Sequence, residues 1–413
     1  MAIKRTKLIN TSRIMREIWT NREISRVQVA RNLGLDKSTV SSIVTDLLEL
    51  GVICETTEGP VGPQGGRRPV NITLDSGFGC VLGAELRPES YTVVGVDLTG
   101  EVVFSKFERL PTRGDALRES LLAVLQRVES EVSACGLPIL GLGLGLSGIV
   151  DPEEGIVKYS IPLKRRDPFH FYKAMATDLD VPFLIENDAN ACAWGELAFH
   201  RHRDLRDFLF VLIELRDIAQ PEIIHEKTAV GFGVVIDGRV HRGYRNSAGE
   251  FRSVLRGREH AGQFSLSPEE SARIDHDPEI MERFIRELAK HIALFTNTFD
   301  LSHVFLGGSI DWRRHRVQET IYEEIQRNWP YPDEVPCRID FSSLGDRAVA
   351  YGAAGMVLER MFADLETMRG LAALQEERGP LLHGWPVGAE AAYRRDRTST
   401  ASTADTGISQ GEE

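Results

Sequence analysis

The sequence predicts an α/β protein with a small, mainly helical N-terminal unit followed by a larger body of two α/β lobes. Three amphipathic helical patterns succeed one another before residue 51. A segment rich in Gly and Pro, residues 58–73, follows them and ends in alternating apolar residues. From Cys80 onward, strand patterns alternate with helical patterns twice over, which is typical of two α/β lobes around a cleft.

Length and composition favour a soluble protein of two or three domains. The chain has 413 residues, of which 42% are hydrophobic and 27% are charged. We expect no membrane segment because no apolar run reaches about 18 residues, and no secretory signal because no apolar stretch follows the basic residues 1–7. The five cysteines lie far apart without a CxxC pair, which favours reduced thiols and a cytoplasmic location.

The charge is divided unevenly along the chain. Residues 1–75 carry 11 Lys and Arg against 8 Asp and Glu, whereas the remainder carries 38 against 53. A small basic unit on a large acidic body is the pattern expected of a DNA reader joined to a small-molecule sensor. The alternative, which charge alone leaves open, is that this small basic excess arises by chance.

The first two helical patterns have clear boundaries. The first, near 11–20, begins at Asn10 or Thr11 and places Ile14, Ile18 and Trp19 on one side. Ser25 is predicted to cap the second helix, residues 26–33, and Gly34 to end it in a left-handed turn. We expect this second helix to turn four residues toward the interior: Val27, Val29, Ala30 and Leu33.

The third helical pattern is predicted to be the reading helix of a helix-turn-helix. Asp36 caps it and Gly51 stops it, and its apolar stripe is Val40, Ile43, Val44, Leu47 and Leu48. Short hydroxyl side chains allow a helix to sit deep in the major groove. The residues predicted to bind DNA are Lys37, Ser38, Thr39, Ser41, Ser42 and Thr45, together with Arg26 and Gln28 of the preceding helix. The alternative is an ordinary three-helix bundle whose Ser and Thr residues only meet solvent.

The segment after the third helix favours the DNA-binding interpretation. Its glycines and prolines and the alternating residues 70–74 predict a strand-loop-strand wing. Arg67 and Arg68 stand at the tip of this wing, where they suit a narrow minor groove or the phosphate backbone. A winged helix-turn-helix over residues 1–76 follows from these observations.

The body is predicted to contain two lobes, residues 77–190 and 191–365. The expected strands are 80–86, 91–98, 101–107, 140–146, 183–185, 208–215, 229–236 and 304–306, and the expected helices are 116–134, 191–200, 278–299 and 347–362. Residues 375–413 lose this periodicity and are rich in Ser, Thr, Gly and acidic residues, so they are predicted to be a disordered tail.

Several motifs together resemble the ROK family of repressors, open reading frames and kinases, over roughly residues 10–360. They are residues 25–41 and 65–69 in the N-terminal unit, and residues 141–148, 186–190, 231–238 and 248–250 in the body. The order and spacing resemble the repressor branch, which includes xylose- and N-acetylglucosamine-responsive regulators. The resemblance implies an actin/sugar-kinase-like body, a double-stranded DNA operator, and a sugar or sugar-derivative effector. Specific DNA reading further calls for a homodimer or a dimer of dimers on a repeated site.

The resemblance also implies a sugar site. In the family, the Asn-Asp pair that matches Asn187 and Asp188 binds sugar hydroxyls, and the acidic residue that matches Glu250 contacts the sugar. A carboxylate beside an amide can accept from and donate to neighbouring hydroxyls. The alternative for an Asn-Asp pair at the end of a strand is a helix cap.

Two phosphate-binding loops of the kinase members have no counterpart here. The first is replaced by residues 85–89, where Pro88 lacks an N–H and two glutamates would repel a triphosphate. The second has Ala229 and Phe232 where glycines are usual. We therefore expect no catalytic residue, no cofactor and no enzymatic activity. The alternatives are a sugar kinase with an accessory DNA-binding unit and a constitutive DNA-binding protein whose body only dimerises.

The family's zinc element is also missing. Many members follow the acidic residue with a Gly-His pair and a cysteine knot, but Glu250 is followed by Phe251-Arg252-Ser253, and no Cys lies between Cys192 and Cys337. We expect no metal site. Arg252 is assigned to the effector site, where it either pairs with Glu250 or Glu259 or contacts an acidic or phosphorylated sugar. The family has a further sugar-contacting glutamate within the cysteine knot, and Glu270 is suggested as its counterpart although no motif marks it.

Overall fold

The computed structural model describes residues 2–58, 70–200, 205–216, 227–258, 262–309 and 314–363. The N-terminal unit packs three helices against a small antiparallel sheet of order β1-β3-β2. Its elements are α1 (Ala2–Asn21), β1 (Ile24–Ser25), α2 (Arg26–Leu33), α3 (Lys37–Glu49), β2 (Ile53–Glu58) and β3 (Val70–Leu74). The paired strands β2 and β3 flank the predicted wing, whose tip lies outside the described residues.

The turn between α2 and α3 follows the predicted chemistry. The Ser25 hydroxyl accepts from the Gln28 N–H at 3.3 Å, and the Gln28 side chain accepts from the Ser25 N–H at 3.0 Å, so the two residues form a capping box. Gly34 adopts the left-handed conformation at φ 63°. Asp36 stands at the start of α3 as predicted, but its side chain makes no capping hydrogen bond.

Two predictions for the N-terminal unit were wrong. The first helix begins at Ala2 rather than near Thr11. Val27 does not face inward, because its side chain is 47% exposed. Val29 and Ala30 define the buried side of α2, and a residue two positions before Val29 lies on nearly the opposite side of a helix.

The first lobe is a five-stranded sheet of order β11-β7-β4-β5-β6, in which β7 pairs parallel with both β4 and β11. Its strands are β4 (Cys80–Leu86), β5 (Tyr91–Asp97), β6 (Val102–Glu108), β7 (Ile139–Leu146) and β11 (Phe183–Asn187). Helices α4 (Leu117–Ala134) and α5 (Phe171–Met175) and a small sheet of β8 (Ile149–Asp151), β9 (Ile156–Tyr159) and β10 (Phe169–His170) complete it.

The second lobe is a five-stranded sheet of order β14-β13-β12-β15-β16. Its strands are β12 (Phe208–Leu215), β13 (Thr228–Ile236), β14 (Arg239–Val240), β15 (His303–Gly308) and β16 (Arg338–Phe341). Helices α7 (Pro268–Arg273), α8 (Pro278–Phe299) and α9 (Arg314–Arg327) cover one side of it, and α8 supplies much of the buried apolar surface.

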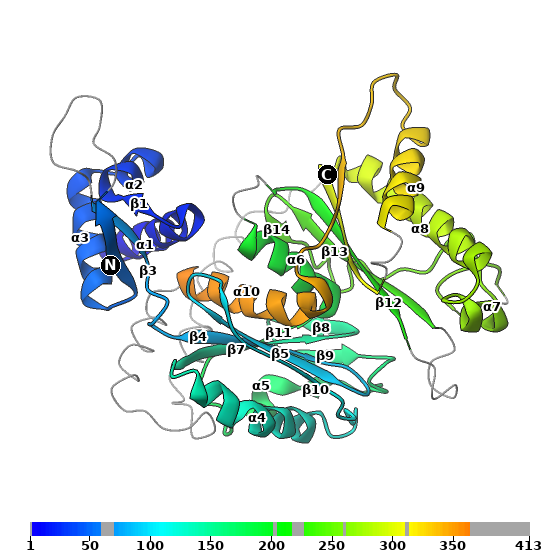
Figure 1. Cartoon of the computed structure of the whole chain (residues 1–413), viewed down its shortest axis with the longest axis horizontal. Coiled ribbons are helices and arrows are strands. Elements are labelled where there is room, and N and C mark those ends of the chain that lie inside the picture. Colours follow the sequence, from blue (N-terminus) through cyan, green and yellow to red (C-terminus); the bar gives the residue numbers. More distant parts are fainter. Residues whose placement is uncertain are drawn as a thin grey trace, which may run out of the picture.

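Helices α6 (Asp188–Phe199) and α10 (Ala348–Ala363) lie between the two sheets (Figure 1). The predicted start of helix 191–200 was wrong, because α6 begins at Asp188 directly after β11. Close approach depends on glycines: a Cβ on Gly352 would lie 1.7 Å from the Ala191 carbonyl oxygen. The two lobes therefore meet along a helix pair that leaves no room for side chains at this crossing.

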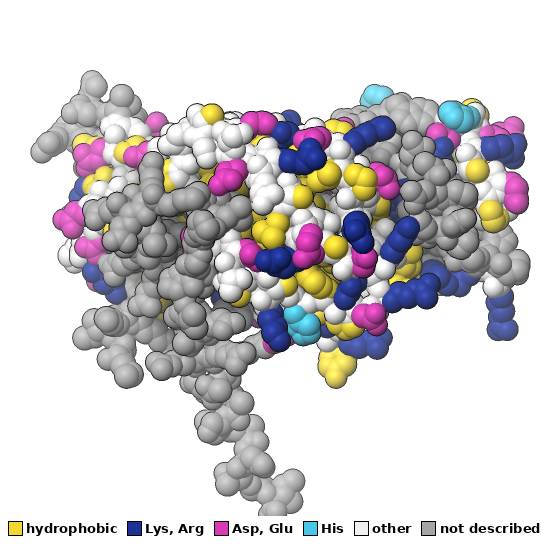
Figure 2. All heavy atoms as spheres, turned by 90° about the horizontal axis from the view of Figure 1, so that it is seen from below, with side chains coloured by type: hydrophobic (Ala, Val, Ile, Leu, Met, Phe, Trp, Pro, Cys, Tyr) yellow, Lys and Arg dark blue, Asp and Glu magenta, His cyan; other side chains and the backbone are white. Residues whose placement is uncertain are grey.

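The face of the first lobe that is seen from below in Figure 1 carries both signs of charge. Basic and acidic side chains are interspersed over its described part (Figure 2). The first lobe also carries surface ion pairs, such as Arg113 with Asp115 at 3.0 Å and Arg127 with Glu108 at 2.5 Å. The described part of this face does not form the uniformly basic surface that binding to DNA phosphates favours.

The glycine contact between α6 and α10 predicts a large cost for a single methyl group. Gly352→Ala should lower the free energy of unfolding by about 1–3 kcal/mol, because the added Cβ meets backbone that cannot rotate away. Gly77→Ala is the matched control, since its Cβ would meet only the Asp75 carboxylate at 3.1 Å. Urea denaturation of both variants measures the difference, and equal stabilities would contradict this account of the helix crossing.

Candidate functional site

The outer face of α3 is free to meet a macromolecule. Val40, Val44 and Leu47 are fully buried on its inner face. The opposite face exposes Lys37, Ser38, Ser41, Ser42 and Thr45, with Thr39 half-buried. None of these six side chains makes a hydrogen bond or an ion pair with any residue that the structure describes. The structure therefore brings the predicted reading residues together on one polar surface.

Of the other residues predicted to contact DNA, Arg26 and Gln28 already have partners within the N-terminal unit. Arg26 forms an ion pair with Glu55 at 3.0 Å on the surface of the N-terminal unit. Gln28 is exposed, but its side-chain oxygen is taken up by the Ser25 cap, which leaves the amide group for other contacts. Arg67 and Arg68 lie outside the described residues.

Asn187 is the N-cap of α6. Its side-chain oxygen accepts from the Asn190 N–H at 3.1 Å, and its amide donates to the Gly148 carbonyl oxygen at 3.0 Å. The helix-cap alternative therefore describes Asn187 in this structure. Asp188, the first residue of α6, accepts only from the neighbouring Ala189 N–H, at 2.8 Å, among the hydrogen bonds of the described chain. Asp188 is thus the member of the pair with unused acceptor capacity.

A buried ion pair that has no local sequence signal holds the end of β11 in place. The Glu186 side chain is fully buried and accepts from Arg242 Nε at 2.9 Å and Nη2 at 2.5 Å. Trp194 Nε1 donates to the same carboxylate at 3.3 Å. Arg242 follows β14 in the second lobe, so the pair holds the end of β11 against the opposite lobe. A charge pair between residues so distant in sequence leaves no local signal.

Two Glu-Arg pairs meet where β4 and β12 end. Arg87 Nε donates to Glu85 at 2.7 Å and lies 3.9 Å from an oxygen of Glu214 in the second lobe, while Arg216 lies 3.1 Å from Glu214. Glu85 is buried, and its other oxygen has no hydrogen-bond partner among the described residues. Burial raises the pKa of Glu85 to about 6, with Arg87 acting in the opposite direction.

Asp188 faces this acidic surrounding. Desolvation raises the pKa of Asp188 well above its usual range, and the carboxylates of Glu214, Glu250 and Glu85 raise it further. Desolvation also raises the pKa of Glu250, although this residue is exposed at the surface. Four acidic side chains from the two lobes therefore lie near enough to act on one another, and both Arg87 and Arg216 already have acidic partners.

The loop after Glu250 departs from the expectations in part. Arg252 is exposed and forms no ion pair with Glu250, while Glu259 lies outside the described residues. The buried Ser253 hydroxyl lies 2.9 Å from Nε2 of His291, a buried histidine of α8 whose pKa is lowered by desolvation. The Glu270 carboxylate caps α7 and pairs with Arg283 at 2.5 Å, which argues against the suggested sugar contact.

No cluster of three or more His, Cys, Asp or Glu side chains suited to a metal ion occurs among the residues that the structure describes. Within those ranges, no helix combines the length and apolar character needed to cross a membrane.

Comparisons with known proteins cover both parts of the chain. The profile of the ROK family matches residues 91–255 and 272–360, and a profile described as winged helix-turn-helix DNA-binding matches residues 8–53. The xylose repressor of Bacillus subtilis is 23% identical over 402 residues, which cover 88% of this chain and 98% of that protein. The xylose repressor of Caldicellulosiruptor bescii is 29% identical over 248 residues, 59% of this chain and 58% of that protein.

Solved structures share the fold. A ROK family transcriptional regulator, described as a homologue of the Escherichia coli MLC protein, aligns with a TM-score of 0.69 and 21% identity, over 89% of this chain and 99% of that one. A ROK family glucokinase of Streptomyces griseus with glucose and AMPPNP aligns with a TM-score of 0.51 and 19% identity, over 67% and 99%. The first match spans the N-terminal unit and the body together.

The raised pKa of Glu85 predicts a specific pH dependence of stability. Its folded value of about 6 lies above the usual 4.5, so the folded state binds the extra proton between these pH values and the free energy of unfolding falls as the pH rises through them. Glu85→Gln removes this titration. Between pH 4 and pH 7.5, the free energy of unfolding of the variant should therefore rise by about 2 kcal/mol relative to that of the wild type.

Urea denaturation at both pH values measures this gain. Glu119→Gln is the matched control, because Glu119 is exposed at the start of α4. Identical pH profiles for the wild type and Glu85→Gln would contradict the proposed state of Glu85.

Proposed function

The chain belongs to the ROK family, and from this premise we propose that it is a sequence-specific DNA-binding transcription regulator, a repressor, controlled by a sugar or sugar derivative. The observation that carries the proposal is the polar outer face of α3 within a winged helix-turn-helix that is joined to a ROK body. The names of its relatives, which include xylose repressors and the dual regulator NagC of Escherichia coli, support the same function.

We propose further that the body does not transfer phosphate. By the family resemblance, the end of β4 is where kinase members hold nucleotide phosphates. Here Glu85, Arg87 and Glu214 form a charged bridge between the lobes, and Pro88 has no N–H to offer a phosphate. A triphosphate at this place would meet carboxylates in a partly desolvated site, which strongly disfavours binding.

The same charges favour an effector without a net negative charge. Asp188 is surrounded by Glu85, Glu214 and Glu250, and a hydroxyl group can donate to these carboxylates whereas a phosphate or carboxylate is repelled. Arg87 and Arg216 offer little compensation, because each already bonds a glutamate. We therefore favour a neutral sugar over a phosphorylated or acidic one, with Arg252 at the open side of the site.

Specific reading is assigned to two copies of the chain. One α3 helix presents about four side chains to base edges, which is too few for useful specificity. We propose that a homodimer or a dimer of dimers places two such helices on a palindromic or repeated site.

A charge reversal on α3 tests the DNA-binding assignment. Ser41→Glu should reduce binding of a duplex that the wild type enriches from a random library by at least about tenfold, because it places a carboxylate against DNA. Ser130→Glu on the exposed side of α4 adds the same charge to the body and should bind like the wild type. Electrophoretic mobility shifts measure both. Undiminished binding by Ser41→Glu would exclude α3 as the reading helix.

Truncation of Asp188 tests the effector site. In calorimetric titrations, Asp188→Ala should bind the best neutral sugar of a panel roughly ten- to hundredfold more weakly than the wild type, since loss of a buried hydrogen-bonding partner costs about 1–3 kcal/mol. The wild type should prefer D-glucose to glucose 6-phosphate and glucuronate. Asp115→Ala, at an exposed ion pair, is the control. Equal affinities for wild type and Asp188→Ala would place the sugar elsewhere.

A further inference from the structure

Helix α6 connects the sugar cleft to α10. It begins at Asp188, and its next turns press against α10 with almost no side chain between them. A Cβ on Gly352 would lie 1.7 Å from the Ala191 oxygen, and one on Gly355 would lie 2.7 Å from Ala198 Cβ. Neither helix can slide along the other without a clash, so the two helices move together.

The opposite side of α10 is fitted just as closely to the first lobe. A Cβ on Gly83 of β4 would lie 1.9 Å from the Ala350 carbonyl oxygen, and one on Gly143 of β7 would lie 2.1 Å from the Ala353 oxygen. Asp346, just before α10, is close enough to Glu85 to raise the pKa of that carboxyl. The first turn of α10 therefore stands beside the charged bridge of the cleft.

The far end of α10 holds the N-terminal unit. The rings of Trp19 of α1 and Phe362 of α10 meet edge to face, with centroids 4.4 Å apart, and Arg16 lies 3.3 Å from the Glu359 carboxylate. Ile14, Ile18 and other buried residues of α1 share one apolar cluster with the last turns of α10. At 16 residues, α10 spans about 24 Å from the cleft to this contact.

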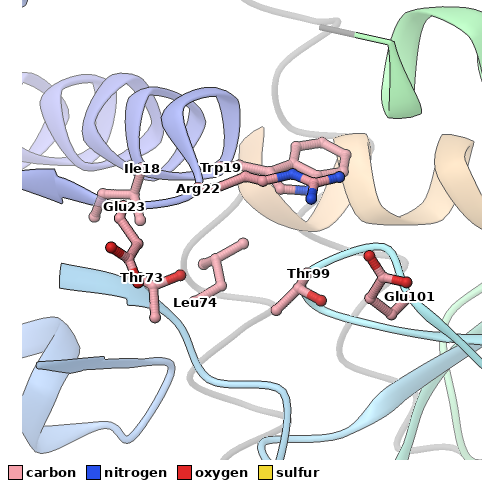
Figure 3. Close-up of a pocket in the computed structure, with 8 residues that line it drawn as sticks. All are labelled: Ile18, Trp19, Arg22, Glu23, Thr73, Leu74, Thr99 and Glu101. Atoms are coloured by element: carbon pink, nitrogen blue, oxygen red, sulfur yellow. The ribbon is translucent and has the colours of Figure 1, made fainter. Parts of the chain in front are cut away.

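A cavity lies beside the contact. Its volume is about 210 Å³, and it separates α1 and β3 from the turn between β5 and β6. Figure 3 shows Trp19 and Arg22 on one side of this space and Thr99 and Glu101 on the other. Tyr351 of α10 donates to the Gly100 carbonyl oxygen of that turn at 2.5 Å. The N-terminal unit is thus firmly held at α10 but has open space next to this hold.

We propose that α10 carries the state of the sugar cleft to the DNA-binding unit, and this inference rests on the proposed function. A sugar at Asp188 that draws the lobes together shifts α6, and the close-packed α10 shifts with it. The Trp19–Phe362 contact then tilts α1 into or away from the cavity, which repositions α3 relative to its counterpart in a second copy. The sugar acts by binding one of these two arrangements more tightly than the other.

The test compares coupling rather than affinity. The probe sugar is whichever of D-xylose, D-glucose and N-acetyl-D-glucosamine raises the melting temperature of the wild type most. The measured quantity is the ratio of DNA dissociation constants with and without saturating sugar, which in coupled systems is typically about 5–150. Phe362→Leu opens the contact with Trp19, so its ratio should approach one while its sugar affinity stays that of the wild type.

Two further variants separate the link from general loosening. Phe284→Leu makes the same change in the core of the second lobe, where Phe284 meets Phe264 edge to face at 4.9 Å, and should keep the wild-type ratio. Gly355→Ala disturbs the α6–α10 contact instead and should lower the ratio as Phe362→Leu does. If Phe362→Leu keeps the full wild-type ratio, or if Phe284→Leu lowers the ratio as much as Phe362→Leu does, the role of α10 is overturned while the proposed function still stands. A wild type whose DNA binding no sugar of the panel changes overturns the proposed sugar control and the inference with it.

Discussion

Glycines on two sides of α10 allow this helix to pack in direct contact with the first sheet and with α6, and this packing sets how the two lobes are arranged. Gly83 and Gly143 let α10 lie directly on the first sheet, and Gly352 lets it lie directly on α6. Because α6 also packs on β12 and β13, this one helix ties both lobes together. The strand ends that carry Glu85 and Glu214 belong to separate sheets, so their relative position depends on these two helices.

The cleft has an electrostatic character that follows from this arrangement. Glu85 and Glu214 come from different sheets, and Arg87 lies between them. The carboxylates cost free energy when buried, and the arginines compensate only part of it, as the raised pKa of Glu85 indicates. Asp188 in the middle is therefore poised to gain from any donor group that enters. A hydroxyl-rich ligand supplies several such donors.

The sequence predicted the regular elements well and the long-range contacts poorly. The bounds of β4, β12 and α8 were confirmed at both ends, because buried apolar runs and strong capping residues mark them locally. The prediction that Val27 faces inward was wrong, because apolar character alone does not show which side of a helix is buried. The sequence left open whether the Asn187–Asp188 pair caps a helix, and the structure shows that Asn187 does so at the start of α6. Arg242 escaped notice because its partner Glu186 is brought to it only by the fold.

The apolar cluster shared by α1 and α10 has a consequence for how the chain is made. Trp19 leaves the ribosome early, whereas Phe362 and Met361, which complete its surroundings, are synthesised near the end of the described chain. Contacts between residues so far apart form slowly, because a long loop must close first. The ring of Trp19 therefore has no aromatic partner on α10 until Phe362 has been synthesised, and the N-terminal unit acquires its native docking only after that point.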